Sequence, residues 1–206
     1  MSPRTEEQNQ KIKDERHEQI LQAGIAVFAH KGFAATKITD IAAAANMSHG
    51  LIYHYFTSKE AVYVAIIERA MQGAAVFATE ALEKPGTAWE RLRYLCERQL
   101  AGIREHPEYY AVIVQALTSQ DIPEEAHAAL QRFGSKVYMA TLTLVQQGQQ
   151  AGQVVAGDPV ELTYAFYSLI QGIAISTVSQ LRVRPQETTD NDHSIKVDTA
   201  LRILKA

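Results

Sequence analysis

Apolar residues recur along most of the chain at the spacing of one face of an α-helix, and no stretch alternates long enough to favour a β-strand. The first such pattern predicts a helix over about residues 14–31, which Gly32 ends as a left-handed cap. Gly24 within it costs about 1 kcal/mol relative to Ala, which indicates a close helix crossing. The polar segment 1–16 is mixed in charge, and we expect a frayed arm there.

Two short helices joined by a tight turn follow. Thr36 stands just before the first, where its oxygen can cap free amide groups. Asn46 breaks the periodicity, since Asn tolerates the left-handed backbone of a sharp turn, and Ser48 caps the second helix. The inward face of this second helix is formed by Ile52, Tyr55 and Phe56, and its outward face by His49, Gly50, Tyr53 and His54. Such a pair is typical of a helix-turn-helix, whose second helix lies in the DNA major groove.

Six later patterns complete an all-α chain. They predict helices over residues 59–84, 89–106, 107–117, 123–148, 159–181 and from about 194 onward, with a polar loop at 185–193 before the last one. We therefore expect a three-helix DNA-binding module at residues 14–58 and a helical bundle for ligand binding and dimerisation at residues 59–206. The helix that begins at Lys59 belongs to both parts, which makes it the mechanical link between them.

Length and cysteine content narrow the class of protein. At 206 residues the chain can bury a proper core in one or two domains. Its single cysteine, Cys96, permits no intrachain disulfide and favours a cytoplasmic setting; its amphipathic surroundings favour a buried hydrophobe over a nucleophile. We see no secretion signal, and Gln171 and Gly172 interrupt the most apolar stretch, so we expect no membrane association.

The charge distribution matters more than its total. A net charge of −3 and a pI near 6.2 argue weakly against nucleic-acid binding. Between residues 19 and 59, however, Asp40 is the only acidic residue. The same stretch holds the cationic or titratable residues Lys31, Lys37, Lys59, His30, His49 and His54. A locally cationic surface on an acidic body still supports salt-dependent binding to phosphates.

The same stretch resembles a known family. The residues that carry the resemblance are Gly32, Phe33, Thr36, Ile38, Ile41, Ala42, Ala45, Ser48, Gly50, Ile52, Tyr53, Phe56, Ser58, Lys59 and Glu60. They look like the amino-terminal signature of TetR/AcrR-type transcriptional regulators and cover about the first third of the chain. Asn46 and Met47 stand where that family usually has Gly and Val. The resemblance implies a homodimer in which the last two helices pair with their copies.

We predict DNA contacts from the start of the second short helix and its surroundings. The predicted residues are Thr36, Lys37, Thr39, Ser48, His49, Gly50, Leu51, Tyr53, His54 and Lys59. His49, Gly50 and Leu51 face the base edges, and most of the others face phosphates. Tyr53 and His54 could instead be half-buried surface residues. His49 and His54 do not share one helical face and lack further ligands nearby, so we expect no metal and no cofactor.

The carboxy-terminal helices carry aromatic rings with a few polar groups, which suit a small-molecule pocket. The predicted effector-binding residues are Trp89, Tyr110, Gln115, Phe133, Tyr138 and Tyr167. Each could equally be plain core. Because the predicted buried faces carry few charges, we expect a small and mostly apolar effector.

These observations favour a ligand-responsive transcriptional regulator that binds a palindromic DNA operator as a dimer. The main form of this hypothesis is a repressor that the effector releases. The alternatives are an activator of the same architecture and an all-α interaction scaffold without DNA binding. An all-α enzyme would need clustered ionisable groups inside the bundle, and the sequence shows none.

Overall fold

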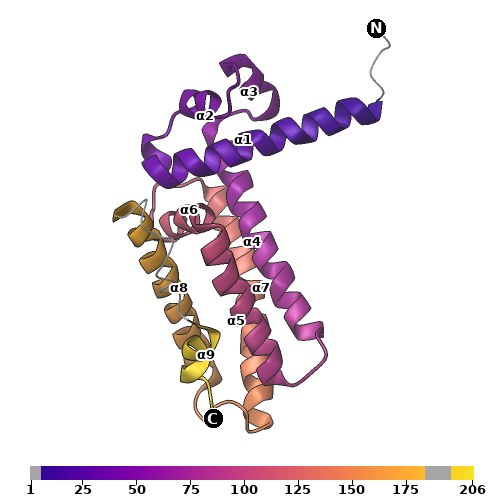
Figure 1. Ribbon diagram of the computed structural model, residues 1–206, viewed down its shortest axis with the longest axis vertical. Coiled ribbons are helices and arrows are strands. Elements are labelled where there is room, and N and C mark those ends of the chain that lie inside the picture. Colours follow the sequence, from indigo (N-terminus) through magenta and orange to yellow (C-terminus); the bar gives the residue numbers. More distant parts are fainter. Residues whose placement is uncertain (1–5, 184–195) are drawn as a thin grey trace.

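The computed structural model describes residues 6–183 and 196–206, and the regular elements in these ranges are all helical (Figure 1). The helices are α1 (Glu6–Ala35), α2 (Ile38–Ala44), α3 (His49–Tyr55), α4 (Lys59–Glu83), α5 (Ala88–Glu105), α6 (Pro107–Thr118), α7 (Glu124–Gln150), α8 (Pro159–Val183), α9 (Val197–Ala200) and a 3₁₀ turn (Leu201–Ile203). An isolated antiparallel bridge joins Val154 to Lys205. The predicted all-α fold is confirmed.

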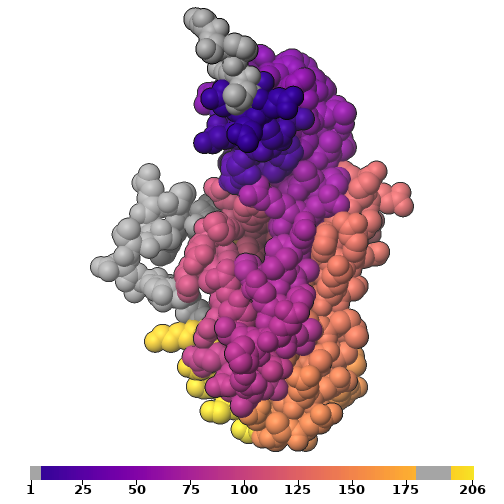
Figure 2. Space-filling view, turned by 90° about the vertical axis from the view of Figure 1, so that its right-hand side faces the viewer, coloured from indigo at the N-terminus to yellow at the C-terminus, as the bar shows by residue number. Residues whose placement is uncertain are grey.

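The molecule is elongated, with the three amino-terminal helices at one end and the bundle of α4 to α8 running lengthwise below them (Figures 1 and 2). α4 begins below the helix-turn-helix of α2 and α3, which we call the motif, and then packs along α7 and α5 (Figure 1). It therefore contacts both the amino-terminal helices and the bundle, as the sequence predicted. Among the described helices, α4 alone is long and apolar enough to cross a membrane by length and composition. Its packing against α1, α5 and α7 is that of a core helix.

α1 is longer than its hydrophobic pattern. It begins at Glu6, so the expectation of a frayed arm is wrong for residues 6–16, while residues 1–5 lie outside the described part of the chain. Glu, Gln, Lys and Arg are good helix formers, and Glu6 and Glu7 in the first turn complement the helix dipole. The first buried residue is Ile20, so the preceding turns project beyond the core.

Two glycines in α1 set its geometry. Gly32 has φ 78°, which ends the regular helix as predicted. A Cβ on Gly24 would lie 2.9 Å from Val62 Cγ1 and 3.1 Å from Ile66 Cδ1, so the absent side chain lets α1 cross α4 closely. This crossing seats the amino-terminal module on α4.

The carboxy terminus differs from the sequence prediction. α9 has only four residues and is followed by the 3₁₀ turn, and the predicted loop 185–193 and helix start at 194 lie outside the described residues. Ala200, Leu201 and Leu204 are fully buried in the chain's own second core. This apolar face is covered by α5 and α8, and the pairing of the last two helices with a second subunit stays a prediction.

Candidate nucleic-acid interface

α2 and α3 are joined by the tight turn that the sequence predicted. Asn46 adopts φ 52°, the left-handed conformation that Asn tolerates. The Ser48 hydroxyl accepts a hydrogen bond from the Leu51 amide at 3.3 Å and so caps α3. Ser48 is exposed and lies immediately before the predicted DNA-facing helix.

The inner face of α3 is fixed by its packing. Ile52 and Phe56 are buried in the core that also holds α1 and α4. His17 of α1 stacks on Phe56, with ring centroids 4.7 Å apart. Gln19 of α1 donates its side-chain amide to the Ala45 carbonyl at 2.7 Å. α1 therefore braces both the turn and the end of α3.

The outer face of α3 is open. His49, Gly50, Leu51, Tyr53 and His54 are all exposed, as expected from the sequence. The His49 ring meets the Tyr53 ring edge to face at 4.8 Å, which orients both side chains. A Cβ built on Gly50 would meet nothing within 4 Å, so the fold itself gives no reason for a glycine there.

Thr36 does not lie where we expected it. The hydroxyl is buried, with 1% of the residue exposed, and donates to the Gly32 carbonyl at 2.7 Å. Lys37, not Thr36, occupies the cap position of α2. The prediction that Thr36 contacts phosphates is therefore corrected. The Thr36 hydroxyl instead donates to the Gly32 carbonyl, at the point where the regular part of α1 ends.

Lys59 also has a structural role. The ammonium group donates to the carbonyls of Phe33, Ala34 and Thr36, at 2.9, 3.3 and 2.8 Å. It also lies 4.6 Å from the centre of the Phe33 ring. Because an ammonium has three N–H donors, this network uses all of them. The prediction that Lys59 binds phosphate is corrected: it caps the end of α1.

Asp40 reduces the positive charge of the motif. Its carboxylate accepts from the Lys37 backbone amide at 2.9 Å and pairs with Lys31 at 2.9 Å. The amide bond first, and the Lys31 ammonium second, hold the pKa of Asp40 below its usual value. Lys37 and Thr39 are exposed beside it, where the sequence analysis placed phosphate contacts.

Three of the predicted effector residues meet inside the bundle. The Tyr167 hydroxyl lies 2.6 Å from Thr141 Oγ1 and donates to the Val137 carbonyl at 3.1 Å. The Tyr138 and Tyr167 rings are 6.2 Å apart. Tyr110 donates to the Gln99 carbonyl at 3.4 Å, on the same side of the bundle. Burial raises the pKa of Tyr110 and of Tyr167 to about 12, so both phenols are neutral hydrogen-bonding groups.

Gln99 and Thr141 belong to this cluster, although the sequence analysis did not name them. Gln99 Oε1 is buried and has no hydrogen-bond partner among the described residues. A lone amide or hydroxyl on an amphipathic helix carries no sequence signal that distinguishes it from a surface residue. Only the meeting of α5, α7 and α8 identifies these two groups.

The other predicted effector residues lie elsewhere. Gln115 donates to the Ala29 carbonyl at 3.2 Å, so it joins α6 to α1 and does not face the cluster. Trp89 lies in the first turn of α5, where its amide bonds to Gln153 Oε1 at 3.3 Å, about 15 Å along the helix from Gln99. Phe133 packs against both cores and carries Arg132 over its ring.

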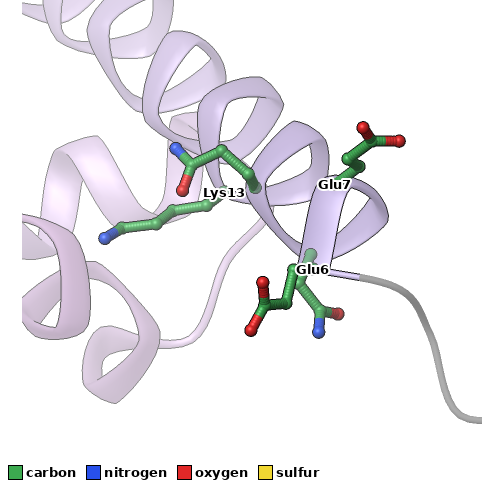
Figure 3. Close-up of a pocket in the computed structure, with 5 residues that line it drawn as sticks. Glu6, Glu7 and Lys13 are labelled. Atoms are coloured by element: carbon green, nitrogen blue, oxygen red, sulfur yellow. The ribbon is translucent and has the colours of Figure 1, made fainter.

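Two hollows on the surface of the described chain lie away from these residues. One is lined by Glu80, Glu83, Lys84 and Tyr94, and the other lies on the first turns of α1 (Figure 3). Neither touches the six predicted effector residues. Within the described ranges no cluster of His, Cys, Asp and Glu could hold a metal ion. Burial raises the pKa of Cys96 to about 12, which keeps this thiol protonated and unreactive.

Comparison with known proteins gives concordant results. Residues 20–66 match the family model described as bacterial regulatory proteins of the tetR family. The HTH-type transcriptional repressor KstR of Mycolicibacterium smegmatis is 24% identical over 190 residues, or 92% of this chain and 87% of KstR. The activator FasR of the same organism is 29% identical over 107 residues, or 52% of this chain and 49% of FasR. A tetR-family regulatory protein from Rhodococcus RHA1 superposes with a TM-score of 0.73 at 22% identity, covering 92% of this chain and 97% of that one.

Proposed function

Because this chain is a TetR-type transcriptional regulator, a DNA-binding protein and not an enzyme, we propose that it is a cytoplasmic repressor. It would bind a palindromic operator as a dimer and leave it when a small, mostly apolar effector enters the bundle. The exposed outer face of α3 carries this proposal. That FasR is an activator keeps activation as the alternative for this architecture.

Gly50 is the strongest support for a DNA partner on α3. A glycine in an exposed helix costs about 1 kcal/mol relative to Ala, and no packing contact in the protein requires one at this position. A glycine next to His49 and Leu51 lets the helix approach a groove without a side chain between them. Gly50 thus destabilises the free protein, but it lies where close approach to DNA would need a residue without a side chain.

Substitution at Gly50 tests this reading. We expect Gly50→Ala to stabilise the free protein by about 0.5–1 kcal/mol and to weaken operator binding. Gly73→Ala is the matched control, because Gly73 lies within α4 and a Cβ there also meets nothing within 4 Å. It should bring the same stabilisation without loss of affinity. Operator duplexes from a random-sequence selection supply the probe, and equal affinity of the two variants would contradict the proposal.

The dimer surface is proposed on α8. An exposed stripe of this helix contains Val160, Tyr164, Ser168, Gly172 and Ile175, with Tyr164 71% exposed. A Cβ on Gly172 meets nothing within 4 Å, so a second helix could approach closely there. A two-fold pair of α8 helices would place two recognition helices on one face of DNA, about 34–36 Å apart, as a palindrome requires.

Charge at the centre of this stripe should separate the subunits. We expect Tyr164→Asp to convert the dimer to a monomer in sedimentation analysis. Tyr53→Asp, on the DNA-facing side, should leave the dimer intact while abolishing operator binding. A chain that sediments as a monomer before any substitution would contradict the proposed assembly.

The effector site is proposed at the cluster of Gln99, Tyr110, Tyr138, Thr141 and Tyr167. Neutral phenols, a hydroxyl and the unpartnered Gln99 oxygen suit a molecule with an apolar body and a hydrogen-bond donor. Since the cluster is closed here, an effector would have to push the helices apart. A coupling of about 1–3 kcal/mol would weaken operator binding roughly 5- to 150-fold.

Two contacts join helices of the bundle to α1 of the DNA-binding module. α6 carries Tyr110 at one end and Gln115, which holds the Ala29 carbonyl of α1, nearer the other. α4 carries Arg69, which pairs with Glu18 of α1. If these contacts transmit the signal, Gln115→Ala should keep operator affinity in the free protein and reduce the effector-induced drop. Tyr167→Phe should instead weaken effector binding itself, measured by calorimetry.

A further inference from the structure

The first turns of α1 form a surface that the helix-turn-helix does not account for. Residues 6–19 precede the first buried side chain and extend for about 20 Å at the helical rise of 1.5 Å per residue. Figure 1 shows this part of α1 reaching beyond α2 and α3, on the side of the molecule opposite to α8. Figure 2 views the molecule from that side, with the indigo atoms of α1 in front.

Packing orients this projecting segment relative to the motif. His17 stacks on Phe56 and Gln19 bonds to the Ala45 carbonyl, so the face between these two residues is turned towards the motif. Lys13 lies one turn before His17, and Arg16 lies one turn before Ile20, which places both cations at this face. Arg16 also donates to the side chain of Gln19 at 2.9 Å. Figure 3 shows Lys13 extending from α1 towards the neighbouring helices while Glu7 points away.

Charges are divided between the two faces of the segment. Glu7, Asp14 and Glu18 lie on the other face, which Glu18 fixes towards α4 through its ion pair with Arg69. Lys11 shares that face, about 160° around the helix from Lys13. On the face turned to the motif, Glu6 is the acidic residue and marks its far end. The basic face thus lies on the side of α1 that contacts Phe56, at the end of α3, and Ala45, in the turn.

The motif itself is short of free positive charge. Of its three lysines, Lys31 pairs with Asp40 and Lys59 is bonded to three carbonyls, which leaves Lys37 exposed. Duplex DNA binding depends on cations that neutralise phosphates. Helical spacing places Lys13 and Arg16 on the face of α1 that carries the contacts to the end of α3 and to the turn, and Lys13 makes no ion pair or hydrogen bond with a described residue.

We propose that Lys13 and Arg16 bind the phosphate backbone of the DNA that flanks each half-site. This inference rests on the DNA-binding function proposed above. Lys13 lies about 10 Å along α1 from Ile20, or about three base-pair steps. Because the segment points away from α8, the contacted phosphates lie outside the half-sites and not between them. α1 thereby extends the footprint beyond the bases that α3 reads.

Salt dependence on two duplex lengths tests the inference. One duplex ends at the outer edge of each half-site, and the other carries eight more base pairs on each side. Lys13→Ala is compared with Lys11→Ala, which removes the same charge from the opposite face. On the long duplex we expect Lys13→Ala to weaken binding about tenfold at 0.1 M salt and to lower the slope of log K against log salt by about 1.8 per dimer.

The two proposals fail in different ways. Lys11→Ala should bind like the wild type, and Lys13→Ala should match the wild type on the short duplex. Equal effects of the two variants, or the same loss on both duplexes, would overturn the role of α1 while leaving the regulator intact. Absence of wild-type binding to either duplex would refute the proposed function together with this inference. Thermal melting of both variants should be unchanged, because both lysines are exposed.

Discussion

Lys59 has two competing roles that one substitution can separate: the structure shows its ammonium bonded to carbonyls at the end of α1, whereas the sequence favoured contact with DNA phosphates. Lys59→Met keeps most of the side-chain stem and removes the ammonium that caps the end of α1. The lost interactions are three N–H···O contacts, two of them short at 2.8 and 2.9 Å, and a cation–π contact with Phe33. They connect the last turn of α1 to the first turn of α4 across a separation of 23 to 26 residues.

The expected loss of stability in Lys59→Met can be worked out from the groups that the ammonium contacts. A hydrogen bond that involves a charged group contributes about 1.5–3 kcal/mol, but Lys59 is only half-buried and water can reach part of the site. We therefore expect the three contacts together to contribute about 2–3 kcal/mol to the free energy of unfolding. For a chain of this size, this corresponds to a fall in Tm of roughly 4–12 °C.

Urea denaturation followed by circular dichroism measures the loss, and operator binding over a range of salt supplies the second readout. Lys37→Met is the matched control, since it removes the same charge from an exposed lysine 22 residues earlier. We expect Lys59→Met to lose stability and keep the wild-type salt slope, and Lys37→Met to do the opposite. A Lys59 variant with wild-type stability and a reduced slope would show that this ammonium binds phosphate and that the capping argument is wrong.

Three further outcomes follow from packing, ionisation and backbone geometry. Gly24→Ala should destabilise the protein by about 1–2 kcal/mol, because the new Cβ meets Val62, and Val62→Ala in the same chain should recover part of this loss in a double-mutant cycle. Burial raises the folded-state pKa of Tyr110 from 10 to about 12. The contribution of Tyr110 to the free energy of unfolding is therefore complete below pH 10 and is lost as the pH rises towards 12. Tyr110→Phe should reduce the fall of this free energy with pH in that range by about 1.4 kcal/mol per pH unit. Asn46→Ala should cost about 1–2 kcal/mol in urea unfolding, whereas Asn46→Gly should be nearly neutral, since the residue has φ 52°.

The motif could be predicted from the sequence because its determinants are local. The helical spacing, the turn at Asn46 and the cap at Ser48 each act over a few residues, and the structure places all three as expected. The same is true of Gly32, whose left-handed backbone ends the regular part of α1. Exposure of α3 followed from its polar face alone.

The misassigned residues depend on partners distant in the chain or on free backbone groups. Lys59 and Thr36 are polar and border the motif, so the sequence favoured phosphate contact. Their actual partners are backbone carbonyls at the end of α1, and no residue pattern marks which carbonyls accept a side-chain hydrogen bond. Gln115 was grouped with the aromatic rings because a small-molecule pocket needs a few polar groups, but α6 turns it towards α1.

The number of cations that contact phosphates determines how steeply operator affinity falls with salt, and this slope can be measured. Among the described residues, Lys37 of the motif and Lys13 and Arg16 of α1 are the three cations per subunit assigned to phosphates, or six per dimer. Six phosphate contacts predict a slope of log K against log salt of about −5 at a pH where histidine is neutral. The acidic body, with a net charge of −3 for the chain, adds no further attraction at a distance. A slope near −9 would require cations beyond these six, and Lys59→Met and Lys31→Met would then show whether these two lysines supply them; a slope near −2 would refute phosphate contacts by α1.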